Sequence, residues 1–274
     1  MTSAVDRPAF PSPPGTAPPA QGSLLDALCC PRCEGRLETA GDGYRCGRCG
    51  RRFPLVGTIP CLVTDPELWR TAWQRQLQGY ARSIDLRVAR IREEAQAPGL
   101  MARTRERLHR IAAAFAEQRR AILALGQALD GDCDPLLAAA IPDQLEELGE
   151  VAILRCYDNI FRDWAWGQRE CDVMMSLVAP LVPRGLGRIA VLGAGSGRLA
   201  ADLHQDREPA RTLALDVNPL PLLVAARVLA HEPVTLPEFP SDPLSDDDVV
   251  LPRPLACPFS VRDGFSLLVA DGLK

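Results

Sequence analysis

The stretch of sequence that decides the fold is Ile189-Ala190-Val191-Leu192-Gly193-Ala194-Gly195-Ser196-Gly197-Arg198-Leu199-Ala200. Its four leading apolar residues predict a buried strand, its glycine-rich run predicts a tight turn, and residues 198–204 predict the start of a helix. Glycines allow the backbone to approach a ligand closely, because they carry no Cβ atom and adopt positive φ at little cost. The helix N-terminus adds free N–H donors, so the stretch predicts a nucleotide-type cofactor site.

The spacing of Gly193, Gly195 and Gly197 separates two classes of cofactor. A dinucleotide fingerprint, G-x-G-x-x-G, would place its third glycine where the chain has Arg198, which disfavours a nicotinamide-dependent oxidoreductase. The observed G-x-G-x-G spacing resembles motif I of the class I S-adenosylmethionine (SAM) methyltransferases. That resemblance implies a turn that faces the methionine and ribose parts of SAM. The alternative is a plain connection between a strand and a helix.

Two further strand-like segments downstream each end in an acidic residue. Residues 211–215 are followed by Asp216, and an acid at this place can accept hydrogen bonds from both ribose hydroxyls. Residues 265–270 are followed by Asp271 and Gly272. In the methyltransferases that the chain resembles, an acid there reaches the adenine amino group. Either aspartate could instead be a helix cap or a turn residue.

The segment at 157–167 reads Tyr-Asp-Asn-Ile-Phe-Arg-Asp-Trp-Ala-Trp-Gly and resembles the carnosine N-methyltransferase-like family. The resemblance extends from this segment to the end of the sequence and implies that Arg162 contacts the carboxylate of SAM. A bidentate pair between a guanidinium and a carboxylate suits this role. A simple ion pair with Asp163 is the alternative. The chain departs from the family at Asn159, where the family has glutamine, and at Asp216, where it has glutamate.

The resemblance assigns the SAM site to Arg162, Gly193, Gly195, Gly197, Asp216, Asp271 and Gly272. It leads to the expectation of a SAM-dependent methyltransferase, in which positioning of the acceptor supplies most of the rate. No catalytic base can be named from these residues. The methyl acceptor and the oligomeric state stay open, and a small molecule or peptide, with a nitrogen nucleophile as one option, is favoured over nucleic acid.

Two C-x-x-C knuckles, separated by 12 residues, form the second informative stretch and consist of Cys30, Cys33, Cys46 and Cys49. Four thiolates at this spacing can surround one Zn²⁺ tetrahedrally. Disulfides are the alternative, but they fit poorly in a chain without a secretion signal. A Gly-Asp-Gly turn at 41–43 predicts a hairpin between the knuckles. Four protein ligands leave no open coordination position, so we expect the zinc to be structural.

The knuckles, together with the run Phe-Pro-Leu-Val-Gly-Thr-Ile-Pro at 53–60, resemble the Trm-type zinc-ribbon family. Members of that family are small subunits that bind and activate methyltransferases, so the resemblance implies a ribbon that docks on the catalytic domain of its own chain. A non-catalytic zinc-ribbon adaptor, or a methyltransferase-activating protein, is the alternative function. A nucleic-acid-binding ribbon also stays open, because this segment contains six arginines, at positions 32, 36, 45, 48, 51 and 52.

Composition and hydrophobic periodicity divide the chain into four parts. Residues 1–22 are rich in proline and predict a disordered tail. Residues 23–64 contain the predicted zinc ribbon, and residues 65–150 carry apolar stripes at helical spacing. Residues 151–274 are the predicted SAM-binding domain. Within them, the proline- and aspartate-rich stretch 231–258 predicts a long loop that is either mobile or a lid over the cofactor.

The expected fold class is therefore α/β, with an N-terminal zinc ribbon, a helical middle, and the first half (three strands) of a Rossmann-like class I methyltransferase sheet. Class I methyltransferases continue beyond a third strand, so we expect an inactive, truncated fragment whose strand 189–192 is an open edge. The sequence contains no membrane-spanning apolar run and no signal-peptide core, which predicts a cytoplasmic protein. Its net charge of −4 gives no overall attraction to nucleic acid or membranes.

Overall fold

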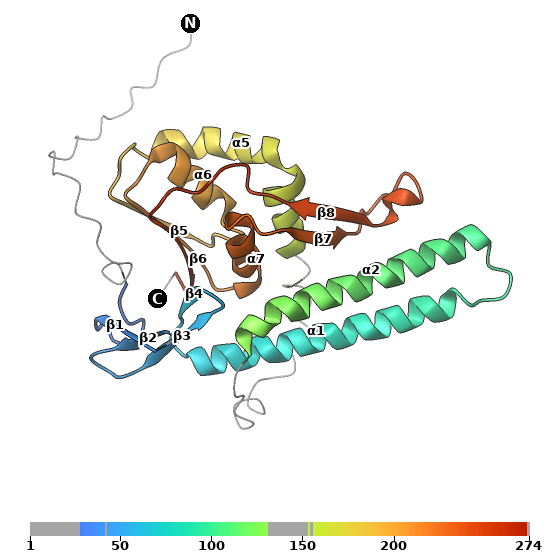
Figure 1. Ribbon diagram of the computed structural model, residues 1–274, viewed down its shortest axis with the longest axis horizontal. Coiled ribbons are helices and arrows are strands. Elements are labelled where there is room, and N and C mark those ends of the chain that lie inside the picture. The colour runs from blue at the N-terminus through green and yellow to red at the C-terminus, as the bar shows by residue number, and fades with distance from the viewer. Residues whose placement is uncertain (1–27, 42, 131–152, 154–155, 273–274) are drawn as a thin grey trace, which may run out of the picture.

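The computed structural model describes residues 28–41, 43–130, 153 and 156–272, so the predicted tail at 1–22 lies outside the described residues. The fold is mixed α/β, and its main sheet has the strand order β1-β2-β3-β4-β9-β6-β5 (Figure 1). The strands are β1 Leu37–Ala40, β2 Gly43–Cys46, β3 Arg52–Val56, β4 Ile59–Leu62, β5 Arg188–Leu192, β6 Arg211–Asp216 and β9 Phe265–Ala270.

All three strands that the sequence predicted around the glycine turn are present. β5 pairs with β6, and β6 pairs with β9, both in parallel. The helix α6 (Arg198–Arg207) connects β5 to β6, and α7 (Pro219–Leu229) connects β6 to β9. Both crossovers run in the same direction along the sheet, so right-handed connections place both helices on one face. Within the described part of the chain, β5 has β6 as its single neighbour, which confirms the expected open edge.

The cysteine-rich strands β1 to β3 pack on the other face of the parallel strands, through one buried cluster. The strand after them, β4, extends the parallel strands, because it pairs with β9, with Cys61 opposite Val269. Phe53 of β3 shares a buried cluster with Leu215 of β6 and Leu268 of β9. Successive residues of a strand point to opposite faces, and Val269 accordingly joins the larger core under the helices. The expectation that the cysteine-rich segment docks on the remainder of its own chain is confirmed.

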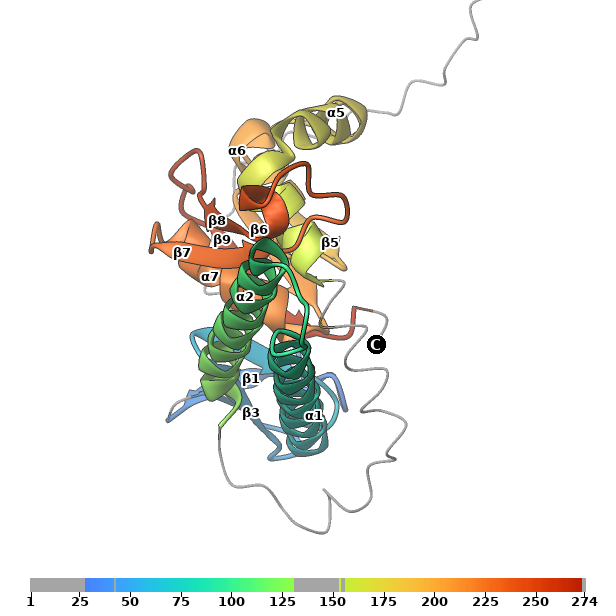
Figure 2. The same ribbon diagram turned by 90° about the vertical axis from the view of Figure 1, so that its right-hand side faces the viewer.

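The predicted helical middle contains two long antiparallel helices, α1 (Pro66–Glu94) and α2 (Ala102–Gly126), which lie side by side and extend away from the sheet (Figures 1 and 2). Asp65 caps α1, because its Oδ1 accepts a hydrogen bond from the N–H of Leu68 at 3.3 Å. Ile84, Val88 and Ile122 are buried in the core, as the apolar stripes predicted. The part of this region at 131–150 lies outside the described residues.

The prediction of a long loop at 231–258 is wrong. This stretch contains an antiparallel hairpin formed by β7 (Val234–Glu238) and β8 (Leu251–Leu255). In an antiparallel pair of strands, residue pairs that exchange two backbone hydrogen bonds alternate with pairs that exchange none. Pro237 lies opposite Pro252, and Thr235 lies opposite Pro254, so all three prolines belong to the same one of these two kinds. Because proline has no N–H to donate, these must be the pairs without hydrogen bonds, and the hairpin loses no backbone hydrogen bond to its prolines.

Candidate functional site

The four knuckle cysteines come together at the end of the ribbon. Their Sγ atoms all lie within 4.8 Å of one another. The Sγ atoms of Cys33 and Cys46 are 3.5 Å apart, and those of Cys30 and Cys49 are 3.7 Å apart. A tetrahedral zinc ion with Zn–S bonds of about 2.3 Å holds its sulfur ligands roughly 3.8 Å from one another. The four predicted cysteines could therefore hold a zinc ion.

Backbone N–H groups favour the thiolate form of one of these cysteines, Cys46, whereas at Cys33 a hydrogen bond from Gly35 is outweighed by burial and the neighbouring sulfurs, which raise the pKa of that thiol to about 12. The N–H groups of Arg48 and Cys49 each point to Cys46 Sγ at 3.4 Å. The Cys49 hydrogen bond is the largest cause that lowers the pKa of the Cys46 thiol to about 6, although burial opposes it. A lowered pKa favours the thiolate, which is the form that binds metals. A Cβ atom at Gly35 would lie 2.8 Å from Cys46 Sγ, so only glycine fits beside the sulfurs.

The glycine turn between β5 and α6 has the backbone that its sequence predicted. The φ angles of Gly193, Gly195 and Gly197 are +62°, +55° and +77°, all in the left-handed region that favours glycine. A Cβ atom at either of the first two glycines would meet nothing within 4 Å, and one at Gly197 would make ordinary contact with Leu267 Cδ2 at 3.5 Å. The first two glycines thus present open backbone, and at the third the positive φ angle, and not crowding, favours glycine.

Asp216 lies at the carboxyl end of β6 and is hydrogen-bonded to this turn. The N–H of Gly195 donates to Asp216 Oδ2 at 2.8 Å, and the N–H of Asn218 donates to Oδ1 at 2.9 Å. The side chain of Asn218 in turn caps α7, because its Oδ1 accepts from the N–H of Leu220 at 3.1 Å. These bonds fix the predicted ribose-binding acid beside the glycine turn.

The predicted adenine-side residues follow the neighbouring strand. Asp271 comes directly after β9, which pairs with β6. A Cβ atom at Gly272 would lie 2.9 Å from Leu192 Cδ2 and 3.1 Å from Leu215 Cδ1. The chain therefore crosses closely over the ends of β5 and β6, and the ends of all three strands meet at one place.

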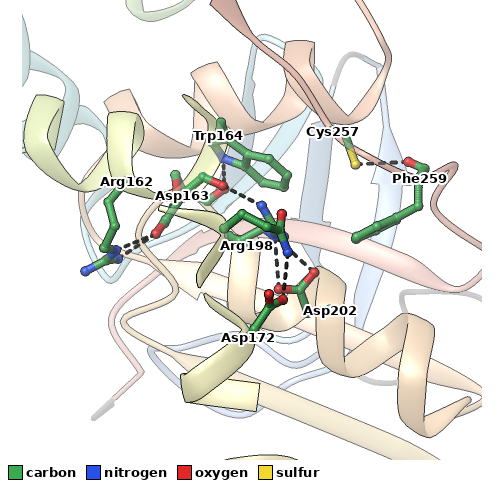
Figure 3. A network of polar contacts seen from close by, with 10 residues as sticks. Arg162, Asp163, Trp164, Asp172, Arg198, Asp202, Cys257 and Phe259 are labelled. Atoms are coloured by element: carbon green, nitrogen blue, oxygen red, sulfur yellow. Dashed lines mark hydrogen bonds and ion pairs between the residues drawn. The ribbon is translucent and has the colours of Figure 1, made fainter. Parts of the chain in front are cut away.

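Arg162 lies next to the turn, but its guanidinium already forms hydrogen bonds with Asp163. It opens a single π-helical turn, Arg162–Trp166, a form often found at functional sites. Its Nε and Nη2 donate to Asp163 Oδ1 at 2.8 and 2.6 Å (Figure 3). The ion pair with Asp163 is thus formed, while the predicted contact with a ligand remains a prediction. Of the seven predicted SAM-site residues, Arg162 and Gly193 line a pocket of about 250 Å³, and the other five do not.

A buried polar network that was not predicted joins the π-helical turn to the glycine turn. Asp163 Oδ2 accepts a hydrogen bond from the Ser196 hydroxyl, and Trp164 Nε1 donates to the Ser196 carbonyl at 3.0 Å. Arg198 lies over the Trp164 ring and donates to the Asp163 carbonyl at 2.7 Å (Figure 3). Its Nε also donates to both carboxylate oxygens of Asp202, at 3.0 and 2.9 Å.

The spacing of Arg198 and Asp202, four residues apart on a predicted helix, was the sequence signal for this network. Burial is the largest cause that raises the pKa of the Asp202 carboxyl, and the charge of Arg198 lowers it in part. Arg198 is 4% exposed, so its partners must satisfy a charge that water does not reach. The network fixes the turn, because Arg198 joins Asp163, Gln168 and Asp202 by hydrogen bonds.

No protein-family model matches this chain, and the curated proteins include no match to its sequence. Among the described residues, no helix is both long enough and apolar enough to cross a membrane.

Proposed function

We propose that the chain is a SAM-dependent methyltransferase of the Rossmann-like class I type, which binds SAM at the carboxyl ends of β5, β6 and β9. In open parallel sheets, ligands bind at this end of the strands. The observation that carries the proposal is the open backbone of Gly193 and Gly195 beside the carboxylate of Asp216. The G-x-G-x-G spacing favours SAM over a dinucleotide, as argued from the sequence.

Asp216 and Arg162 retain hydrogen-bonding capacity for the ligand. Each oxygen of Asp216 accepts one backbone N–H, and a carboxylate oxygen has a second lone pair that a ribose hydroxyl can use. Arg162 uses two of its five N–H donors on Asp163, which leaves three donors, two on Nη1 and one on Nη2, for the carboxylate of SAM. We assign the adenine side to Asp271 and Gly272, at the end of β9.

SAM, when bound, supplies the electrophilic methyl group. The chain's own residues would hold the cofactor at both ends and orient it, and orientation of two reactants is worth several orders of magnitude in rate. In this proposal Zn²⁺ is bound by the four knuckle cysteines and is structural, because four sulfur ligands fill its coordination sphere. The acceptor class that we favour remains a small molecule or a peptide.

The test is calorimetric titration of SAM into the zinc-loaded full chain. We expect saturable binding that is lost in Asp216→Ala and strongly weakened in Arg162→Ala. Arg162→Lys should stay weak, because an ammonium group cannot replace a bidentate guanidinium. Arg184→Ala is the control, because Arg184 is exposed and pairs with Asp206 outside the site. Thermal melting of each variant separates loss of binding from loss of folding.

The second candidate is a non-catalytic zinc-ribbon adaptor, and two observations favour it. Asp163 neutralises Arg162, and the pocket beside the turn, at about 250 Å³, is smaller than most small-molecule sites. A well-folded chain that shows no saturable binding of SAM would reject the methyltransferase and support the adaptor. Saturable binding of NAD would reject both.

A further inference from the structure

The outer face of the ribbon carries two arginines that oppose each other across neighbouring strands. Arg45 of β2 pairs directly with Arg52 of β3, and both side chains are exposed. Like charges directly opposite in a sheet destabilise the pairing. No carboxylate forms an ion pair with either arginine within the described part of the chain.

The alternation of the strands separates this pair from the core. Tyr44 and Phe53 form the next cross-strand pair and point inward, and Phe53 is buried. Glu38 of β1 lies opposite Arg45 in the same outward row. Its Oε1, however, lies only 3.2 Å from the position that a Cβ atom at Gly47 would occupy, so the carboxylate lies beside the second knuckle.

Three further exposed arginines surround the sulfur cluster. Arg32 lies within the first knuckle, and Arg48 lies within the second, where its Nη1 donates to the Cys33 carbonyl at 3.1 Å. The Arg36 carbonyl accepts from the N–H of Gly47 at 3.0 Å, which places Arg36 beside the second knuckle as well. We call these five residues the ribbon arginine surface: Arg32, Arg36, Arg45, Arg48 and Arg52.

The charge of the chain is unevenly distributed. Residues 28–65 contain six arginines and four acidic residues, residues 66–126 contain 12 arginines and six acidic residues, and residues 127–274 contain 12 basic and 23 acidic residues. The net charge of −4 therefore conceals two basic segments, the ribbon and the pair of long helices, beside an acidic one. Local fields of this kind steer oppositely charged partners even where the total charge does not.

We propose that the ribbon arginine surface binds the phosphodiester backbone of nucleic acid. Every basic residue of the surface is arginine, whose planar fork matches phosphate oxygens with two parallel hydrogen bonds. A polyanion would also offset the repulsion between Arg45 and Arg52. Phosphate contacts carry no sequence information, so binding should be independent of base sequence and similar for RNA and DNA.

The experiment measures the fluorescence anisotropy of labelled uridine and thymidine oligonucleotides of about 16 nucleotides, a length that spans one small binding surface. With roughly four phosphates contacted, log Kd against log salt should have a slope near 3 for single strands. The double variant Arg45→Gln/Arg52→Gln should lower that slope by about 1.4 and weaken binding about tenfold at low salt. RNA and DNA should respond alike.

The matched control is Arg90→Gln/Arg120→Gln, which removes the same charge from exposed positions on α1 and α2, and it should leave binding unchanged. Equal losses in the two double variants would mean non-specific attraction and would overturn the proposal, as would the absence of saturable binding to the intact chain. A third outcome, loss of zinc from Arg45→Gln/Arg52→Gln with unchanged oligonucleotide binding, would assign these arginines to balancing the thiolate charge. SAM titration of the same variants should be unaffected, which separates this proposal from the proposed function.

Discussion

Leu62 of β4 lies directly opposite Ala270 of β9, one residue before Asp271. The last strand of the cysteine-rich segment therefore supports the strand that delivers the proposed adenine-side acid. The same segment places Phe53 in one buried cluster with Leu215, the residue before Asp216. Anything that loosens the ribbon should loosen the ends of β6 and β9 with it.

Loss of the metal should therefore destabilise more than the ribbon. We expect Cys46→Ser to abolish zinc binding and to lower the free energy of unfolding by at least about 3 kcal/mol, since structural zinc contributes folding energy directly. Zinc content and thermal melting of the full chain measure this. Cys29→Ser is the control, because Cys29 is exposed and lies outside the sulfur cluster. A chelated, zinc-free protein with unchanged melting would contradict the prediction.

Arg198→Met should be among the most destabilising substitutions near the glycine turn. It leaves the buried carboxylate of Asp202 without its cation, and breaking a buried pair on one side costs about 3–5 kcal/mol. Urea unfolding measures the loss. Arg198→Met/Asp202→Leu should recover part of the stability, because the double variant leaves no uncompensated charge. Arg184→Met, at an exposed ion pair, should cost less than about 1 kcal/mol.

His204 should make stability depend on pH. Its side chain is fully buried, with Nδ1 2.9 Å from Thr212 Oγ1 and Nε2 3.2 Å from the carbonyls of Arg262 and Asp263. Carbonyls only accept, so Nε2 carries the proton of the neutral ring. Burial is the largest cause that lowers the pKa of His204 below its usual 6.5.

Because this pKa is lower in the folded state, the unfolded state binds the proton more readily. The contribution of His204 is therefore complete above about pH 6.5 and is lost as the pH falls through the folded-state pKa. We expect the free energy of unfolding to fall between pH 7 and pH 5, as measured by urea titration. His204→Gln should flatten that fall, and His109→Gln, at an exposed position on α2, should leave it unchanged.

The β7–β8 hairpin should depend on its aromatic contact more than on its charges. Its tip forms exposed ion pairs with α2, between Arg103 and Asp246 and between Arg110 and Asp247. Phe239, just after β7, stacks on Phe115 with ring centroids 4.3 Å apart. We expect Phe239→Ala to cost about 2–3 kcal/mol. Asp246→Asn/Asp247→Asn should cost under about 1 kcal/mol, and less at high salt. Equal effects would show that the charges fix the hairpin.

Local signals in the sequence were sufficient for the elements around the proposed site. Apolar runs ending in Asp216 and Asp271 predicted β6 and β9, and the cysteine spacing predicted the sulfur cluster. These signals are local because strand periodicity and ligand spacing depend on neighbouring residues. The glycines at 193 and 195 likewise predicted positive φ angles, which the turn adopts.

Features that depend on distant partners could not be predicted in this way. The β7–β8 hairpin was missed because Pro237, Pro252 and Pro254 favour a loop, unless it is known that they lie opposite residues with which they need no backbone hydrogen bond. The pairing of β4 with β9 has no local signal, since each strand alone reads only as a short apolar run. The burial of Arg198 was equally hidden, because its other partners come from the π-helical turn and from α5 (Gln168–Val178).

The register between β4 and β9 also constrains the order of folding. Cys61 and Val269 are separated by about 200 residues of chain, and contacts this distant slow folding because the loop between them must close first. During synthesis, the ribbon leaves the ribosome long before β9 has been made, so one edge of β4 stays unpaired during that time. Early metal capture by the knuckles would keep that edge within a folded hairpin, and chains that meet zinc late should aggregate more during synthesis.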